Sequence, residues 1–252
     1  MCVVKKLLQW VNLMDRYERK ARLLPGLIVA SPLGVAAYCL TQDQAGWYKA
    51  LGAGVALEVV LAVGVSYLVR AAGKRLEEKL KKKWNGFPTT RWLRPTDTSH
   101  SEQQKSRWRG AIRQLTKLSI PASLGQKSEA EVDKLVNDAV TQVRHELRNK
   151  EECRMVMIHN EDYGFARNLM ALRWLWLATA AIGLGACAVG AIGLEQRPLL
   201  GMALEAVQVL VALLAAFMMP GYVQQCADRY AESLLAAAVA VAEKQGGSST
   251  EA

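Results

Sequence analysis

The sequence predicts an all-α membrane protein in which two transmembrane helical hairpins flank a basic helical cytoplasmic domain. The first observation behind this fold class is a set of four apolar stretches, each close to the roughly 20 residues that a helix needs to cross the bilayer hydrocarbon. They are Leu23–Leu40, Ala50–Val69, Trp174–Leu194 and Leu199–Met219. The mean hydropathy of +0.05 and the charged fraction of 22% hide these stretches, because the charge lies elsewhere in the chain.

The second observation is how the charge is distributed. Residues 1–22 carry a net charge of +4, residues 70–173 carry +9 from 22 basic and 13 acidic side chains, and residues 174–252 carry −3. Each short loop between paired spans holds one basic residue. Under the positive-inside rule, both termini and the middle domain are therefore expected in the cytoplasm. This topology accounts for a basic chain without any nucleic-acid partner.

These patterns divide the chain into five parts. They are an amphipathic helix over residues 1–22, a first hairpin over 23–69, a basic domain over 70–173, a second hairpin over 174–220, and a C-terminal helix with a disordered tail over 221–252. The first part has one apolar stripe, which is typical of a helix at the inner membrane surface or packed on the middle domain. The tail from Gly246 is rich in Gly and Ser and is expected to be disordered.

The middle domain is predicted to be helical apart from one irregular stretch. The helix of the second span is expected to continue past Val69 until Asn85 and Gly86 stop it. Residues 84–100 are predicted to be irregular, and residues 101–119 to form an amphipathic helix.

Three further helix boundaries can be read from the sequence. Ser128 followed by Glu131 makes a capping box that begins an amphipathic helix. A helix from Glu151 is expected to lead directly into the third span, and a separate cytoplasmic helix is expected after Pro220.

Several classes of function lack their signatures. The five cysteines form no CxxC pair, and the three histidines have no metal-ligand spacing. The chain has no phosphate-binding loop, nucleophile elbow or metalloprotease motif. We therefore expect no enzyme activity, no metal and no cofactor.

Two carboxylates within the spans are candidate pore residues. Glu58 is near the middle of the second span, and Glu205 is in the last span with Gln208 one turn later. A carboxylate in hydrocarbon costs several kcal/mol unless it is paired, hydrated or protonated. These residues are predicted to line a pore or gate that favours cations, or alternatively to form buried structural hydrogen bonds.

A cationic set in the middle domain is a candidate site for a phosphorylated ligand. Arginine binds phosphate bidentately, and hydroxyl groups add neutral donors. Trp92 or Trp108 offers an aromatic face for a base. Contact with anionic lipid or plain solvation is the alternative. The candidate ligand-binding residues are Thr89, Thr90, Arg91, Arg94, Arg107, Arg109, Arg113 and Lys117.

A third candidate feature directly precedes the last two spans. Tyr163 and Arg167 are placed to couple a ligand-binding event in the middle domain to the spans, or to anchor the chain at the membrane interface.

Three short runs of sequence carry a resemblance. Arg19–Pro25 (RKARLLP), Pro88–Arg94 (PTTRWLR) and Tyr163–Leu169 (YGFARNL) resemble segments of a family of small bacterial membrane proteins from anti-phage operons, the membrane effectors of Hailong systems. The resemblance implies an oligomeric ion channel of the bacterial inner membrane. It also implies control by a nucleotide-derived oligomer that a partner nucleotidyltransferase makes.

Two hypotheses of function follow. The first is a homo-oligomeric, ligand-gated pore in the lipid bilayer, controlled by a nucleotide or short oligonucleotide bound to the middle domain and acting in anti-phage defence. The second is a non-conducting membrane scaffold whose basic domain docks a partner protein or anionic lipid.

Overall fold

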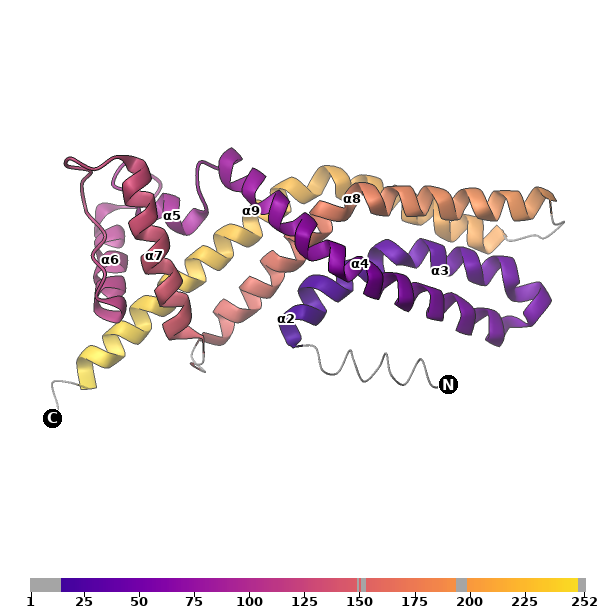
Figure 1. Cartoon of the computed structure of the whole chain (residues 1–252), viewed down its shortest axis with the longest axis horizontal. Helices are drawn as coiled ribbons and strands as arrows, with labels where there is room; N and C mark the ends of the chain where they lie inside the picture. The colour runs from indigo at the N-terminus through magenta and orange to yellow at the C-terminus, as the bar shows by residue number, and fades with distance from the viewer. Residues whose placement is uncertain (1–14, 149, 151–152, 194–198, 249–252) are drawn as a thin grey trace. The chain divides into compact units, whose positions relative to one another are not determined.

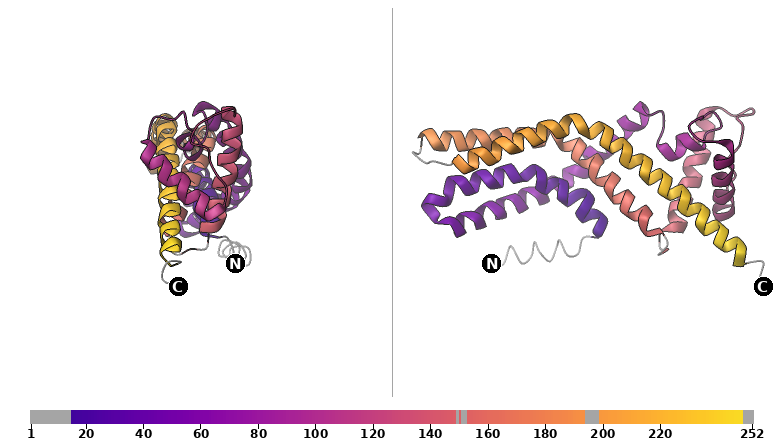
Figure 2. Two further views of the ribbon diagram at one scale, coloured as in Figure 1. Left: turned by 90° about the vertical axis from the view of Figure 1, so that its left-hand side faces the viewer. Right: turned by 180° about the vertical axis from the view of Figure 1, so that it is seen from behind.

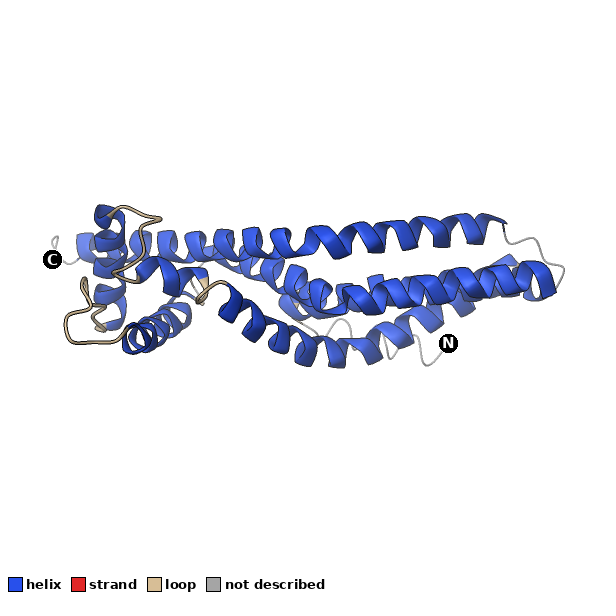
Figure 3. Ribbon diagram, turned by 90° about the horizontal axis from the view of Figure 1, so that it is seen from above, coloured by secondary structure: helices blue, strands red, loops and turns tan. Residues whose placement is uncertain are grey.

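The computed structural model of the chain describes residues 15–148, 150, 153–193 and 199–248. Every regular element in this part of the chain is helical (Figure 3). In chain order the helices are α2 (Arg16–Glu18), the π-helix η1 (Arg19–Leu23), α3 (Leu24–Ala45), α4 (Trp47–Lys83), α5 (Pro88–Leu93), α6 (Glu102–Thr116), α7 (Glu129–Leu147), α8 (Arg154–Gly193) and α9 (Leu199–Ser248) (Figure 1).

Within the described residues, four helices are long and apolar enough to cross a membrane, which confirms that part of the sequence prediction. They are α3, α4, α8 and α9, and each contains all or nearly all of one of the four apolar stretches. Large apolar side chains are exposed on their outer faces, among them Val60 (54%), Ile192 (85%) and Phe217 (74%). Such continuous apolar faces are what lipid or another helix covers in membrane proteins.

The long helices match the sequence prediction at most of their ends. α4 stops at Lys83, followed by Asn85 and Gly86 with φ of 53° and 107°, and α8 runs without a break into the third apolar stretch. α9, however, continues through Pro220, where a separate helix was expected. A proline removes one helical hydrogen bond, and a long helix tolerates this loss where its neighbours compensate.

The structure departs from two other expectations, and a third falls mostly outside the described residues. The stretch predicted to be irregular contains the short helix α5, which Pro88 begins at a position where its missing N–H costs nothing. The tail was expected to be disordered from Gly246, but α9 reaches Ser248. Most of the predicted N-terminal amphipathic helix, residues 1–14, lies outside the described residues, and the rest belongs to α2 and η1.

The chain divides into two compact units. Unit 1 contains the described residues of Met1–Glu77 and Glu161–Val223, and unit 2 contains those of Glu78–Asn160 and Gln224–Ala252. α4, α8 and α9 contribute residues to both.

In unit 1, α3 lies along α4, and α8 lies along α9 (Figures 1 and 2). Glycines bring α3 and α4 close together, because a Cβ on Gly26 would lie 2.8 Å from the Ala62 carbonyl oxygen. Thr179 of α8 donates a hydrogen bond to the Val29 carbonyl of α3 at 2.7 Å. The core of this unit draws on all four helices and consists of Val29, Val69, Leu169, Leu172, Trp176 and Ala212.

Unit 2 is built from α5, α6 and α7, together with the end of α4, the start of α8 and the C-terminal half of α9. The capping box predicted at Ser128 is present, since Glu131 N–H donates to Ser128 Oγ at 3.3 Å and Ser128 N–H donates to Glu131 Oε2 at 2.8 Å. The apolar stripe of α7 is buried as its helical spacing predicted, except at Leu135, which is 38% exposed. The largest fully buried apolar side chains among the described residues of this unit are Leu93, Ile112, Val132, Val136, Val143, Leu234 and Leu235.

Candidate functional sites

Glu205 is the most completely buried carboxylate in the part of unit 1 that the structure describes. Its side chain is 0% exposed, and neither of its oxygens accepts a hydrogen bond from a described residue. The carboxylate lies against Gly183 of α8, where an added Cβ would be only 2.8 Å from the carboxylate carbon. Gly183 therefore makes the space that this acid occupies.

Glu58 also lies against a glycine of the neighbouring helix. Its Cβ would be 3.1 Å from a Cβ on Gly34 of α3, and its side chain is half-buried. Gln208 reaches the same helix, since Ser31 Oγ donates to Gln208 Oε1 at 2.9 Å. The structure thus places Glu58 and Gln208 against neighbouring turns of α3, while Glu205 faces α8.

Two cysteines lie near the buried carboxylate. Cys39 of α3 and Cys187 of α8 belong to one apolar cluster, and both lie beside Gly201 of α9. Among the residues that the structure describes, no group of three or more His, Cys, Asp or Glu side chains could hold a metal ion.

Arg94, a predicted phosphate ligand, is engaged by a carboxylate of unit 2. Its Nε and Nη2 donate to the two oxygens of Asp133 at 2.7 and 2.6 Å, and its side chain is 7% exposed. The hydrogen bond to Asp133 raises the pKa of Arg94 above its already high ordinary value. Gly86 makes room for this fork, because a Cβ there would lie 2.9 Å from Arg94 Nη2.

Two cations of α6 bind the backbone that follows α5. Lys105 is 0% exposed and donates to the carbonyls of Asp97 at 2.7 Å and Arg94 at 3.3 Å. Arg109 donates to the Leu93 carbonyl at 3.2 Å, and both cations pair with Glu102. The hydrogen bond from Lys105 lowers the pKa of Glu102. These side chains satisfy carbonyls that the end of a helix leaves without partners.

The two threonines of the predicted ligand site are also enclosed in the interior of unit 2. Thr89 and Thr90 are buried, and Thr90 Oγ1 donates to Asn137 Oδ1 of α7 at 2.8 Å. A phosphate would have to displace this contact to use the Thr90 hydroxyl as a donor.

The remaining cations of the predicted set are distributed over separate places. Arg107 pairs with Glu243 at 2.8 Å, and Arg91 Nη2 lies 3.9 Å from Asp228. Arg113 and Lys117 are exposed and line a hollow of about 460 Å³ together with Gly110 and Gln114. The structure brings only this last pair of predicted cations into one solvent-facing hollow.

The predicted coupling residues lie at a junction within unit 1. Arg167 pairs with Glu77 of α4, and its guanidinium is 5.5 Å from the centre of the Tyr163 ring. Asn168, which belongs to the same run of sequence, is 1% exposed, and its Nδ2 donates to the Ala21 carbonyl of η1 at 2.6 Å. Its Oδ1 lies against Gly73 of α4. The Asn168 amide of α8 therefore contacts two other helices, η1 and α4.

These features define a class of protein. The part of the chain that the structure describes is all-helical and has four helices long and apolar enough to span a membrane, two of which carry a carboxylate packed on a glycine. Comparison of the chain with protein-family models, curated protein sequences and solved structures finds no match. The assignment of function therefore depends on the sites themselves.

Proposed function

We propose that the chain forms a cation-conducting membrane pore by self-association, and that a ligand bound to unit 2 controls it. One observation carries the proposal: Glu205 is fully buried on an apolar helix, and its oxygens accept no hydrogen bond from a described residue. An ionisable group at such a place is costly, and proteins that keep one commonly use it on an ion or proton pathway.

The surroundings of the two carboxylates support this reading. Gly34 and Gly183 leave space beside Glu58 and Glu205 that a larger residue would fill. The polar contact between Ser31 and Gln208 lies near the same part of α3. Four helices enclose little room for an aqueous path, so the proposal requires several copies whose exposed apolar faces associate.

Ion flux through purified, full-length protein in liposomes tests the proposal. Wild-type protein is expected to release a potassium gradient, and Glu205→Gln to change the rate at least tenfold, because it removes the charge with little change in shape. Val207→Ala is the matched control, since this side chain is 57% exposed on the same helix. A wild-type protein that conducts no better than empty liposomes would refute the pore.

Two glycines of α8 provide a second, steric test. Gly183→Ala places a methyl group 2.8 Å from the Glu205 carboxylate, whereas a Cβ on Gly185 meets nothing within 4 Å. Flux is expected to change with Gly183→Ala and to remain at the wild-type level with Gly185→Ala. Equal behaviour of the two variants would contradict a role for the position of Glu205.

The proposed ligand is an anionic nucleotide or short oligonucleotide, and its first contacts are assigned to Arg113 and Lys117. These cations are exposed and face a hollow, and the hydrogen bond from Lys117 Nζ to the Gln114 carbonyl at 3.2 Å is open to solvent. Arg94 and Arg109, by contrast, are buried against protein acceptors. Binding of a fluorescent single-stranded oligonucleotide is expected to fall at least tenfold in Arg113→Gln/Lys117→Gln. The double variant Lys79→Gln/Lys134→Gln removes the same charge elsewhere in unit 2 and serves as the control. Unchanged binding in the first variant excludes the hollow.

The membrane arrangement is part of the proposal. The two pairs of long helices are proposed to form two transmembrane hairpins, with both termini and the basic unit 2 in the cytoplasm, as the distribution of Lys and Arg suggests. The resemblance described above adds a proposed role in anti-phage defence at the bacterial inner membrane. A plaque assay comparing wild type with Glu205→Gln tests that role, and equal protection by both would contradict it.

The alternative is a non-conducting scaffold that binds anionic lipid. Beyond its apolar stretch, which ends at Val69, α4 carries basic side chains that would attract acidic head groups at a membrane surface. They are Arg70, Lys74, Arg75, Lys79, Lys81, Lys82 and Lys83. Absence of flux together with salt-sensitive binding to vesicles containing phosphatidylglycerol would favour the scaffold over the pore.

A further inference from the structure

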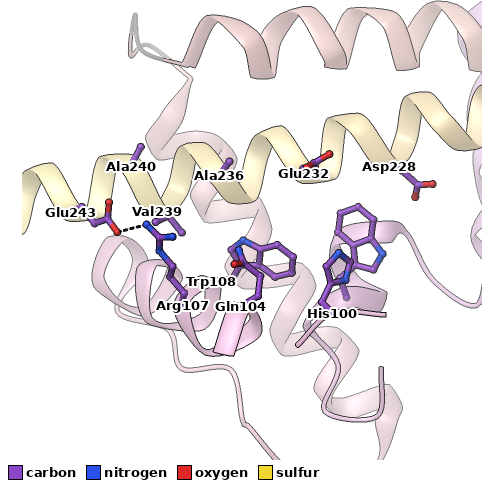
Figure 4. A pocket seen from close by; sticks show the side chains of 11 residues that line it. His100, Gln104, Arg107, Trp108, Asp228, Glu232, Ala236, Val239, Ala240 and Glu243 are labelled. Atoms are coloured by element: carbon purple, nitrogen blue, oxygen red, sulfur yellow. Dashed lines mark hydrogen bonds and ion pairs between the residues drawn. The ribbon is translucent and has the colours of Figure 1, made fainter. Parts of the chain in front are cut away.

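Unit 2 contains a cavity whose lining differs in charge from an anion site. Its volume is about 650 Å³, within the range of small-molecule sites, and it lies between α6 and α9 (Figure 4). The lining side chains come from α5, α6, α9 and the segment before α6. They are Trp92, His100, Gln104, Arg107, Trp108, Asp228, Glu232, Ala236, Val239, Ala240 and Glu243.

One wall of the cavity is aromatic. The rings of Trp92 and Trp108 are nearly parallel, at 20°, with centroids 6.3 Å apart. The His100 ring lies 4.7 Å from the first and 4.9 Å from the second. Aromatic faces grouped in this way attract organic cations, because the π system presents partial negative charge.

The opposite wall is acidic and belongs to one face of α9. Three carboxylates line the cavity against a single guanidinium, that of Arg107, which is paired with Glu243 at 2.8 Å (Figure 4). Asp228 and Glu232 are one turn apart. Asp228 Oδ1 is buried and accepts no hydrogen bond from a described residue, and Arg91 Nη2 at 3.9 Å is too far to donate one.

Between the acids, α9 presents only small apolar side chains. Ala236, Val239 and Ala240 lie on the stripe that joins Glu232 to Glu243. Helical spacing of 1.5 Å per residue separates Asp228 from Glu243 by about 22 Å along the axis. The cavity wall therefore has carboxylates towards both ends and an apolar stretch between them.

We propose that this cavity binds a linear polyamine. The alkyl segments would lie on the alanine stripe and the indole rings, one ammonium would bind Asp228 and Glu232, and a second would approach Glu243. Cation–π attraction and charge-assisted hydrogen bonds act together on such a ligand. An anionic nucleotide would bring its phosphates towards three carboxylates and be repelled. The inference concerns unit 2 alone and is independent of whether the chain conducts ions.

Isothermal titration of the full-length protein in detergent with spermidine tests the proposal. Wild-type protein is expected to bind spermidine, and Asp228→Asn/Glu232→Gln to weaken binding at least tenfold. Glu146→Gln/Glu129→Gln is the matched control, because it removes the same charge from exposed positions of α7 and should keep wild-type affinity.

A second variant changes volume and leaves the charge unaltered. Ala236→Phe fills the cavity from an exposed helix position and is expected to abolish spermidine binding with little effect on folding. The proposal is overturned if wild-type protein does not bind spermidine, or if both the charge variant and the filled cavity bind it as wild type does. It is also overturned if an oligonucleotide occupies the cavity, seen as binding that Ala236→Phe removes and Asp228→Asn/Glu232→Gln strengthens.

Discussion

Replacing Arg94 with Gln should loosen unit 2, because the fork between Arg94 and Asp133 joins the end of α5 to α7. Removing one partner of a buried ion pair costs roughly 3–5 kcal/mol. Asp133 is 25% exposed, so water reaches the carboxylate that would be left behind, and the lower end of this range applies. We therefore expect a loss of about 3 kcal/mol, equivalent to an increase of roughly 100-fold in local opening.

Hydrogen exchange of the full-length protein in detergent, followed by mass spectrometry on peptides from α5 and α7, measures this loss of stability. Arg107→Gln is the matched control, because the Arg107–Glu243 pair has the same chemistry but side chains 59% and 61% exposed. Exposed ion pairs contribute about 0.2–1 kcal/mol, so amide exchange in Arg107→Gln should rise less than about fivefold. Adding Asp133→Asn to Arg94→Gln should cost less than the sum of the two single changes. If Arg94→Gln and Arg107→Gln behave alike, the fork is not structural.

Three further predictions concern stability. Gly86→Ala should destabilise unit 2 by about 1–3 kcal/mol, because residues other than glycine rarely adopt its φ of 107° and the added Cβ meets Arg94. The control is Gly110→Ala, whose Cβ meets nothing within 4 Å and which should leave the thermal midpoint unchanged or raise it. Hydrogen bonds from Ser128 lower the pKa of Glu131, so the stabilisation by this cap should be fully present above the ordinary glutamate pKa and be lost as the pH falls through the lowered value. Amide exchange at the start of α7 across this pH range measures the loss, and an exchange rate that shows no such dependence on the cap would contradict the prediction. Asn168→Leu leaves the Ala21 carbonyl without its partner and should lower the thermal midpoint of the protein in detergent, whereas an unchanged midpoint would exclude the junction as a source of stability.

The helices that are long and apolar enough to cross a membrane could be predicted from the sequence, because the signal for them is local. Length and hydropathy within about 20 residues decide whether a helix can cross a bilayer, and neighbouring segments enter only weakly. The signal that ends α4 is also local, because it lies in Asn85 and Gly86, which adopt positive φ. The expected helix boundary at Pro220 was wrong because the deciding factor there is not local. The packing of α9 on other helices decides whether the helix continues through a proline.

The partners of the cationic residues could not be predicted in the same way. Arg94 meets Asp133 from 39 positions away, and Arg107 meets Glu243 from 136 positions away. No periodicity within one segment contains such pairings. The glycine opposite Glu205 is likewise on another helix. Sequence reasoning therefore found the charged residues but not whether each charge already has a partner.

The burial of Lys105 gives unit 2 a chemical reporter. An amine-reactive reagent modifies the exposed lysines of the chain at once, but a side chain that is 0% exposed and holds two carbonyls reacts only after the segment following α5 has detached. The rate of acylation at this lysine would therefore time the opening of unit 2. A membrane-permeable reagent would give the same rate in intact cells, without extraction of the protein.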